Sequence, residues 1–275
     1  MSLHFLKMHG AGNDFVLVDG FSQSGLQLDA KLAQALADRR RGVGADQILW
    51  VERGRELPFG YRIYNADGST AGQCGNGARC IAAYLHRHYG LPKNFSVESP
   101  AGIVEARILD GDQVEVSLGR PSWLAADIPT TLAVSNQGEV SFQALNRDWP
   151  GTALSLGNPH LVIEVANVDA APLAQLGEWI KQADCLADGA NLSMVQVQSA
   201  DTLRLRVYER GVGETLACGS GACAAAIAMQ LRGRVQSAVR LQLPGGLLQV
   251  RWDRPAGTVY LTGPAQSVYA GVFQQ

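Results

Sequence analysis

The five residues Cys74-Gly75-Asn76-Gly77-Ala78 recur 144 residues later as Cys218-Gly219-Ser220-Gly221-Ala222. A period of this length is that of a whole domain rather than of a short solenoid repeat. The sequence therefore predicts two copies of one domain. Further matches keep the same order at offsets of 144 or 145: Tyr64 with Tyr208, Gly12-Asn13 with Gly157-Asn158, Gly44-Ala45 with Gly189-Ala190, Pro100 with Pro244, and Gly119 with Gly263.

The chain of 275 residues is long enough for two domains of roughly 130 residues each. We expect an N-terminal repeat over residues 1–119, which the tail 264–275 rejoins. The C-terminal repeat spans 120–263, and its first part, 120–149, serves as a connection.

Hydrophobic patterning predicts the elements of each copy. Alternation of Leu203, Leu205 and Val207 with two arginines is typical of a half-buried strand. The expected strands are 15–18, 47–51 and 102–109 in the first copy, and 160–165, 202–208 and 247–252 in the second. The expected helices follow Asp29 and Pro172, and cover about 76–89 and 220–231. The helix after Cys218 is apolar all round and should be buried on every side. We predict an α+β fold in which each repeat wraps a mixed or antiparallel sheet around a central helix.

The charge balance excludes one broad class of function. Lysine and arginine number 23 against 25 acidic residues, a formal net charge of −2, so the chain lacks the basic surface of a nucleic-acid-binding protein. We interpret the one basic cluster, Arg39-Arg40-Arg41, as a cap on a helix C-terminus. No segment has the roughly 20 apolar residues of a membrane span, and no secretory signal is evident. We therefore expect a cytoplasmic protein with neither nucleic acid nor membrane as a partner.

Cys74 and Cys218 stand at the predicted starts of the two central helices. The first turn of a helix offers N–H groups without intrahelical acceptors and a partial positive charge. Both effects lower the pKa of a cysteine and favour the thiolate. The flanking glycines allow the backbone to approach an anion such as a carboxylate. If the duplicated fold brings the two helix starts face to face, they form a symmetric site with a thiol on each side.

The other three cysteines carry less information. The total of five is odd and no CxxC pair occurs, which argues against a disulfide framework and against a zinc ribbon. Cys80 and Cys223 lie inside the predicted helices and are interpreted as buried packing residues. Cys185 has no counterpart in the other copy and is assigned no role.

Polar residues also fall at corresponding places in the two copies. Asn13 and Asn158 follow equivalent glycines, and Asn65 and Glu209 follow equivalent tyrosines. An asparagine in a glycine-containing turn usually serves the turn itself. Several amides together with a Glu-Arg pair instead suggest donors and acceptors for the ammonium and carboxylate groups of an amino acid. The further members of this set are Gln47, Asn191 and Arg210.

In these motifs the chain resembles the diaminopimelate epimerase family, and the resemblance extends over nearly its whole length. The resemblance rests on both cysteine motifs and on four further stretches. These are Lys7-Met8-His9-Gly10-Ala11-Gly12-Asn13-Asp14-Phe15, Tyr64-Asn65-Ala66-Asp67-Gly68-Ser69, Gly157-Asn158-Pro159-His160 and Tyr208-Glu209-Arg210-Gly211.

The resemblance implies an epimerase that interconverts LL- and meso-2,6-diaminopimelate in bacterial lysine biosynthesis, with neither pyridoxal nor metal. It implies that Cys74 and Cys218 are the two acid/base groups and that His160 and Glu209 tune their acidity. Two similar domains would close over the substrate, and a homodimer would form through a surface that includes Tyr269. The implied substrate-binding residues are Asn13, Gln47, Asn65, Gly75, Asn76, Asn158, Asn191, Glu209, Arg210, Gly219 and Ser220.

Elementary chemistry agrees with this reading. The α-hydrogen of an amino acid is very weakly acidic, so without an electron sink the charge must pass into the α-carboxylate. Helix N-termini aimed at that carboxylate stabilise the charge where it develops. Inversion is simplest with a base on one face of the carbon and an acid on the other. One thiolate and one thiol satisfy this requirement, although the sequence does not decide which cysteine serves which face.

Other functions remain open from the sequence. A proline racemase or hydroxyproline epimerase also uses paired cysteines, but a cyclic substrate with one carboxylate does not need Arg210. A phenazine-synthesis-type isomerase of related fold is expected to lack the cysteine pair. A thiol-based metal or redox module is disfavoured because the histidines show no recognised ligand spacing.

Overall fold

The computed structural model describes residues 2–23, 25–183, 186, 189–254 and 257–274. The chain divides into two compact units, which are residues 1–117 with 262–275, and residues 118–261. Strand β17 (Val259–Pro264) passes from the second unit into the first. Among the described helices, none is long and apolar enough to cross a membrane.

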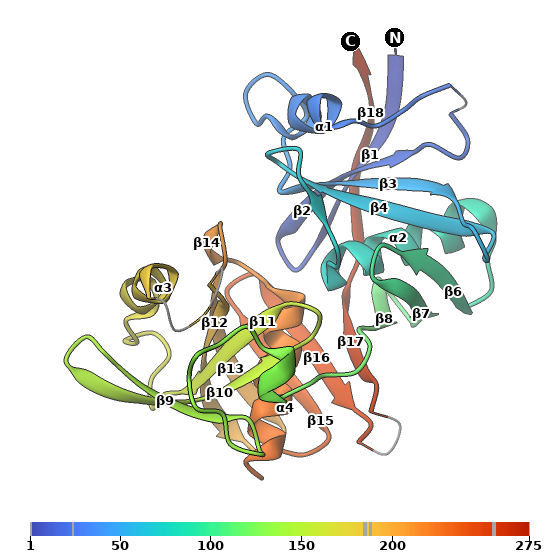
Figure 1. Ribbon diagram of the computed structural model, residues 1–275. Helices are drawn as coiled ribbons and strands as arrows, with labels where there is room; N and C mark the ends of the chain where they lie inside the picture. Colours follow the sequence, from blue (N-terminus) through green and yellow to red (C-terminus); the bar gives the residue numbers. More distant parts are fainter. Residues whose placement is uncertain (1, 24, 184–185, 187–188, 255–256, 275) are drawn as a thin grey trace. The chain divides into compact units, whose positions relative to one another are not determined.

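The first unit is a mixed sheet with two helices (Figure 1). Its strand order begins β18-β1-β2-β3-β4, and β4 pairs with both β5 and β6 before β7 and β8 follow. The pairs β2–β3 and β4–β6 are parallel, and the others in this series are antiparallel. The elements are β1 (Ser2–Gly10), β2 (Asn13–Asp19), α1 (Ala30–Ala37), β3 (Gln47–Arg53), β4 (Phe59–Asn65), β5 (Thr70–Ala71), α2 (Gly75–Tyr89), β6 (Asn94–Ser99), β7 (Gly102–Ile108), β8 (Gln113–Ser117) and β18 (Gln266–Gln274).

The second unit repeats this plan. Its order is β9-β10-β11-β12-β13, and β13 pairs with both β14 and β15 before β16 follows. The pairs β11–β12 and β13–β15 are the parallel ones. The elements are a 3₁₀ turn (Ala125–Asp127), β9 (Glu139–Ala144), β10 (Arg147–Ser155), β11 (Pro159–Glu164), α3 (Leu173–Gln182), β12 (Asn191–Ser199), β13 (Thr202–Glu209), β14 (Gly213–Thr215), α4 (Gly219–Leu231), β15 (Ala238–Leu243) and β16 (Gly246–Trp252).

The repeat extends to strand register. Phe15 of β2 lies opposite Gln47 of β3, and His160 of β11 lies opposite Asn191 of β12. Because His160 follows Asn158 as Phe15 follows Asn13, Gln47 and Asn191 occupy equivalent positions. The predicted α+β fold of two similar repeats is therefore confirmed.

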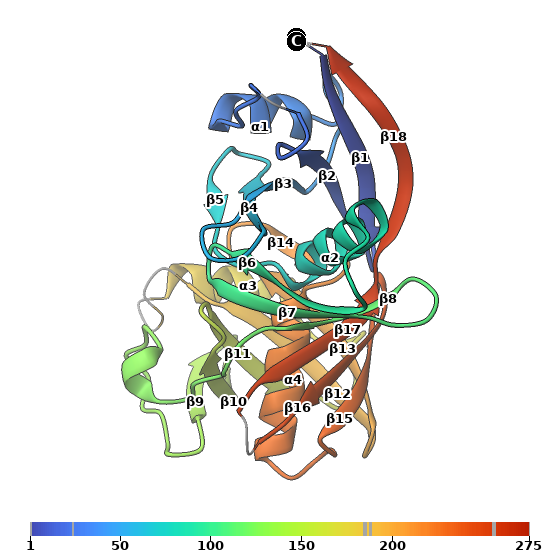
Figure 2. The same cartoon turned by 90° about the vertical axis from the view of Figure 1, so that its right-hand side faces the viewer.

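A central helix lies against the sheet of each unit (Figure 2). Helix α4 packs on β10, β11, β12, β13, β15 and β16, and every residue from Gly221 to Gln230 is buried. Helix α2 packs on β1, β2, β3, β7 and β8. Its first turns are buried throughout, whereas its last turn is polar and ends at Gly90 in the left-handed conformation. The predicted burial of helix α4 is confirmed. In both units the buried first turn holds the start of the central helix against the sheet.

The outer helices begin where the sequence predicted. Asp29 is the N-cap of α1, and its carboxylate accepts a hydrogen bond from the N–H of Leu32 at 2.8 Å. Such a cap satisfies an N–H that the helix leaves unpaired. Helix α3 begins directly after Pro172 and buries Leu176 and Ile180.

The interpretation of the arginine cluster as a dipole cap was wrong. Helix α1 ends at Ala37, before the arginines, with Asp38 as its C-cap. The Arg39 guanidinium instead lies 2.7 Å from a carboxylate oxygen of Asp14 and 2.8 Å from one of Asp46. The two acidic side chains attract Arg39 more strongly than the exposed end of a short helix does.

Candidate active site

Cys74 is the N-cap of helix α2 and forms the centre of the first half-site, which also comprises Asn13, Gln47, Asn65, Gly75 and Asn76. The Cys74 Sγ accepts a hydrogen bond from the N–H of Gly77 at 3.3 Å, and the thiol donates to Asn13 Oδ1 at 3.8 Å. The N–H groups of Gly75 and Asn76 belong to the first turn, where the helix itself offers no acceptor. An anion beside this turn meets N–H donors and the positive end of the helix.

A glycine at the third helical position allows each cysteine to sit against the sheet. A Cβ on Gly77 would come within 2.9 Å of a Leu49 methyl carbon, and one on Gly221 within 3.1 Å of both Val207 methyl carbons. The helix starts are thus pressed onto strands β3 and β13. The repeated glycines of the two motifs have a packing role as well as the predicted role of exposing backbone.

The Asn13 amide is held in one orientation by a charged network. Its Nδ2 donates to Asp46 Oδ2 at 2.8 Å, so Oδ1 faces Asn76 Nδ2 at 3.2 Å. Asp46 also pairs with Arg39, which bridges to Asp14. Burial would raise the pKa of Asp14, but hydrogen bonds from Arg39 and Lys7 outweigh it and hold the pKa well below its usual range.

Gln47 and Asn65 form a second pair of amides in the first half-site. They lie opposite each other on β3 and β4, and Gln47 Nε2 donates to Asn65 Oδ1 at 2.9 Å. Asn65 Nδ2 donates in turn to the Ser69 hydroxyl at 3.0 Å. Gln47 is therefore oriented by a neighbour on the adjacent strand, and Asn65 by Gln47 and by Ser69 in the turn before β5.

Cys218 is the N-cap of helix α4 and forms the centre of the second half-site, which also comprises Asn158, His160, Asn191, Glu209, Arg210, Gly219 and Ser220. Its side chain is buried, and the thiol donates to Glu209 Oε2 at 3.0 Å. The other carboxylate oxygen of Glu209 accepts from the Thr215 hydroxyl at 2.5 Å. Ser220 Oγ lies 3.6 Å from the sulfur.

The expectation that a helix start lowers the pKa of Cys218 was wrong. Burial raises the pKa of this thiol well above its usual range, and the charge and hydrogen bond of Glu209 raise it further. These causes outweigh the opposite contributions of Gly221 N–H and the Ser220 hydroxyl. Desolvation and a neighbouring carboxylate both disfavour an anion, so Cys218 is a protonated thiol in this structure.

Asn158 links the buried His160 to the start of helix α4. The His160 Nε2–H donates to Asn158 Oδ1 at 3.1 Å, and Asn158 Nδ2 donates to Ser220 Oγ at 3.3 Å. Burial lowers the pKa of His160 to about 3, and the charge of Arg210 acts in the same direction. His160 is therefore neutral, and its buried Nδ1 has no hydrogen-bond partner among the described residues.

Asn191 and Arg210 complete the second half-site. Asn191 Oδ1 accepts from the backbone N–H of Arg210 at 2.9 Å, and its Nδ2 lies 3.5 Å from the Pro159 carbonyl oxygen. Arg210 is exposed at the end of β13. Its backbone is fixed while its guanidinium is presented to solvent.

The structure thus assembles the predicted residues into two half-sites, one in each unit. It adds three residues that the sequence analysis missed: Thr215 beside Glu209, Asp46 beside Asn13, and the fully buried Arg79, which donates to Asn76 Oδ1 at 2.9 Å. Each acts by orienting a predicted residue. The sequence offered a signal for Arg79, namely a charged residue directly after the first cysteine motif, inside a helix predicted to be central.

The remaining predicted residues lie elsewhere. Cys80 and Cys223 are buried, as predicted, whereas Cys185 lies outside the described residues. Tyr269 is on β18, with its ring 5.9 Å from that of Phe5 in an edge contact.

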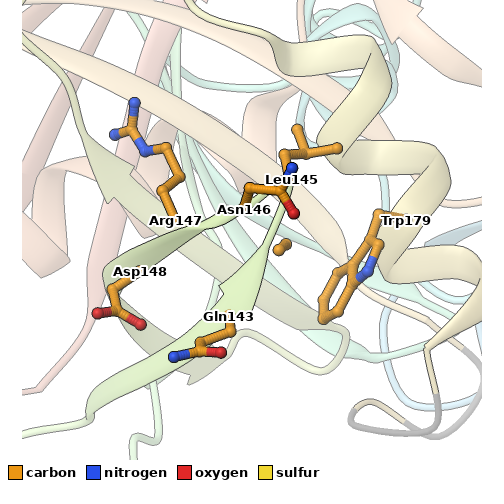
Figure 3. Close-up of a pocket in the computed structure, with 7 residues that line it drawn as sticks. Gln143, Leu145, Asn146, Arg147, Asp148 and Trp179 are labelled. Carbon is orange, nitrogen blue, oxygen red and sulfur yellow. The ribbon is translucent and has the colours of Figure 1, made fainter.

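A surface pocket of about 580 Å³ in the second unit lies between the β9–β10 turn and Trp179 of helix α3 (Figure 3). It includes none of the predicted site residues and none of the residues that orient them. Its lining residues are Gln143, Ala144, Leu145, Asn146, Arg147, Asp148 and Trp179.

Solved structures share this fold at low sequence identity. A predicted epimerase from Pseudomonas aeruginosa aligns with a TM-score of 0.70 and 18% identity, over 99% of each chain. A hydroxyproline epimerase from Agrobacterium vitis aligns with a TM-score of 0.70 and 13% identity, over 98% of this chain and 92% of that one. These likenesses show that the two-repeat fold also occurs in those two proteins.

Sequence comparisons identify the family. The diaminopimelate epimerase family model matches residues 5–124 and 152–268. A diaminopimelate epimerase of Xanthomonas euvesicatoria is 46% identical over 98% of this chain and 95% of the relative. One of Thermosynechococcus vestitus is 42% identical over 98% of this chain and 99% of the relative. The chain belongs to the diaminopimelate epimerase family.

Proposed function

We propose that this protein interconverts LL- and meso-2,6-diaminopimelate for lysine biosynthesis, without pyridoxal phosphate. Family membership over nearly the whole chain supports this substrate. The observation that carries the mechanism is the difference between the two sulfurs. Cys218 donates a hydrogen bond to the Glu209 carboxylate, whereas Cys74 donates one to the neutral amide oxygen of Asn13. Because a neighbouring carboxylate disfavours a thiolate, we assign Cys218 as the resting acid and Cys74 as the resting base.

The two cysteines act on opposite faces of the α-carbon. The Cys74 thiolate takes the α-proton and becomes a thiol, and the electron pair of the C–H bond passes into the α-carboxylate. Cys218 then gives its proton to the other face and becomes a thiolate. The reverse reaction exchanges the two roles, so no proton is gained or lost over a cycle.

The first turns of both central helices bind the carboxylate that gains charge. The N–H groups of Gly75, Asn76, Gly219 and Ser220 stabilise it more strongly as the charge develops. Arg210 binds the distal carboxylate through its planar guanidinium. Asn13, Gln47, Asn65, Asn158, Asn191 and Glu209 recognise the remaining ammonium and carboxylate groups.

The half-buried Glu209 and the buried His160 tune the thiols. Glu209 keeps Cys218 protonated until the carbanion forms, and His160 orients Asn158 at the helix start without adding charge. The hydrogen bonds and pKa shifts of the second half-site support both roles.

The protein forms a homodimer through strand β18. Val268, Tyr269 and Val272 on this strand are 57%, 47% and 47% exposed, an apolar strip that a second copy would cover. We place the enzyme in the cytoplasm, a reducing compartment in which the thiols that the mechanism requires persist.

Isotope labelling tests the two-base mechanism. In heavy water, LL-diaminopimelate should give early meso product that carries deuterium at the inverted centre, while recovered substrate stays largely unlabelled. Cys74→Ala and Cys218→Ala should each reduce inversion by about 10³-fold or more, because each removes the chemistry of one face. Chiral chromatography with mass spectrometry measures both quantities.

Cys80→Ala is the matched control, since Cys80 is a buried thiol one turn and a half along the same helix. It should retain the labelling pattern of the wild type. Product that keeps the original hydrogen, or rapid inversion by either variant, would contradict the mechanism. Absence of any reaction in the folded wild type would contradict the substrate.

A further inference from the structure

Thr215 contacts the carboxylate that holds the Cys218 proton. Its hydroxyl donates to Glu209 Oε1 at 2.5 Å, and Glu209 Oε2 accepts from the Cys218 thiol at 3.0 Å. The two oxygens of one carboxylate thus have separate partners. The cysteine motifs do not point to Thr215, because its hydrogen bond is made to Glu209 rather than to the helix start or to the sulfur.

We propose that Thr215 is a positioning residue for the epimerisation, whose hydroxyl holds the Glu209 carboxylate against the Cys218 thiol. This inference rests on the proposed function in one respect, namely that Cys218 is an acid in the reaction.

Strand register explains why Thr215 reaches Glu209. Thr215 of β14 lies opposite Val207 of β13, and Gly213 lies opposite Glu209. Residues 207 and 209 face the same side of the strand, so Thr215 is the diagonal neighbour of Glu209 on that side. The residue directly opposite Glu209 is a glycine, which leaves room for the carboxylate to turn toward Thr215.

The hydroxyl has a physical task at this position. Glu209 is half-buried, and an ionised carboxylate that has access to water gains solvation by turning outward. The Thr215 hydroxyl replaces one water at the inner position, so the carboxylate stays beside the sulfur with little reorganisation. A charge-assisted hydrogen bond of this kind is stronger than one between neutral groups.

The first repeat lacks both members of this arrangement. Ala71 of β5 lies opposite Ile63 of β4, as Thr215 lies opposite Val207. Asn65 stands where Glu209 stands, and its amide is oriented by Gln47 and Ser69. The hairpin therefore forms without a hydroxyl at this position. A threonine is present in the repeat that has the carboxylate and absent from the repeat that has an asparagine in its place. This pairing indicates that Thr215 serves Glu209 rather than the formation of the hairpin.

A thiol titration tests the inference without requiring any epimerase activity. The Cys74→Ala protein is alkylated with iodoacetamide across a range of pH, and the Cys218 peptide is followed by mass spectrometry. Adding Thr215→Val should lower the pH midpoint of Cys218 alkylation by about one unit, toward the value given by Glu209→Gln, because the carboxylate moves away. Adding Thr215→Ser should restore the midpoint. Thr202→Val, which removes a hydroxyl at the far end of β13 and bonded to Asp201, is the control.

Steady-state kinetics with otherwise wild-type protein gives the second readout. Thr215→Val should reduce kcat about tenfold with little change in KM, and Thr215→Ser should recover most of the loss. In a Glu209→Gln background, Thr215→Val should reduce kcat by less than about twofold, because Thr215 affects catalysis through Glu209.

Three results would overturn the inference. They are an unchanged alkylation midpoint, equal losses for the valine and serine variants, and a valine effect of full size in the Glu209→Gln background. If the wild type does not epimerise diaminopimelate but the midpoint shifts as described, the proposed substrate is wrong while the positioning of Glu209 by Thr215 stands. Thermal melting of each variant identifies any loss that reflects unfolding.

Discussion

Cys74 and Cys218 each precede the first turn of a central helix, yet their sulfurs meet different neighbours. The Cys74 sulfur accepts from the N–H of Gly77 and donates to the neutral amide oxygen of Asn13. The Cys218 sulfur is buried and donates to the Glu209 carboxylate. Equivalent backbone positions therefore give one sulfur beside a neutral amide and one beside a carboxylate.

The equivalent asparagines differ in the same way. Asn13 directs Nδ2 to Asp46 and its oxygen toward the helix start, whereas Asn158 directs its oxygen to His160 and Nδ2 toward Ser220. The cause is the residue behind each amide. A carboxylate accepts only, so it takes the NH₂ group, while the imidazole Nε2–H donates and takes the oxygen.

A duplicated fold can thus give two chemically different half-sites. The repeat preserves a cysteine at the N-terminus of each central helix. The side chains next to each helix start differ, and in the proposed mechanism this difference makes one cysteine the acid and the other the base.

Replacing Glu209 makes the second half-site more like the first and should have the largest effect. Glu209→Gln keeps the shape but removes the charge that raises the pKa of Cys218, so the Cys218 alkylation midpoint should fall. The epimerisation rate should drop about 100-fold, because the resting acid is no longer held protonated. Rates of product formation and the pH dependence of alkylation measure the two effects.

Glu214→Gln is the matched control for this change. Glu214 neighbours Thr215 on β14 but forms an ion pair with Arg206 at 2.7 Å. A comparable loss in both variants would mean that general charge, rather than the contact with Cys218, determines the rate.

Releasing the Asn13 amide should have a smaller effect. Asp46→Asn allows the neighbour to donate or accept, so the Asn13 oxygen is no longer fixed toward Asn76. We expect kcat/KM to fall about tenfold, the usual scale for one lost orienting hydrogen bond. Stability should change by less than about 1 kcal/mol, because the Arg39–Asp46 pair is exposed.

Asp110→Asn serves as the control for the Asp46 variant, since Asp110 is fully exposed and pairs with Lys93 at 3.6 Å in the same unit. Wild-type kcat/KM in Asp46→Asn would show that Asn13 keeps its orientation without the carboxylate.

Much of the fold could be predicted because its signals are local. The helix starts at Asp29 and Pro172 were predicted from a capping residue and a proline. Those after the two cysteines were predicted from the repeated glycine-containing motif and the apolar residues that follow it. Strand β9 was missed inside the stretch 120–149, although Val140, Phe142 and Ala144 alternate with polar residues and are buried. That alternation is a strand signal, and it was available in the sequence.

The half-sites were harder to predict because their properties depend on contacts between distant segments. The sequence identifies Cys218 and Glu209 as residues nine apart, but not that burial and the carboxylate together raise the pKa of the thiol. Arg39 was misinterpreted for a similar reason, since its partners Asp14 and Asp46 come from other segments. Local sequence predicts where a helix begins, whereas the charge state at that point is set by tertiary packing.

His160 gives the smallest and last prediction, a difference in how the two units respond to mild acid. Its pKa is about 3 in the folded protein against an ordinary value of 6.5. Below about pH 6.5 the unfolded chain therefore binds a proton that the folded second unit does not, so stability falls as the pH falls. In the first unit, Asp14 and Asp19 have pKa values lowered from 3.8, and their contribution is lost only in more acidic solution. Between pH 7.5 and 6 the free energy of unfolding of the second unit should fall by less than about 1 kcal/mol through His160, and that of the first unit should be nearly unchanged.

Hydrogen exchange of β11 and β2, corrected for the intrinsic effect of pH, measures the two units separately. His160→Gln should flatten the response of β11, whereas the exposed His4→Gln should leave it intact. An equal response of both units in the wild type would show that His160 is not the group responsible.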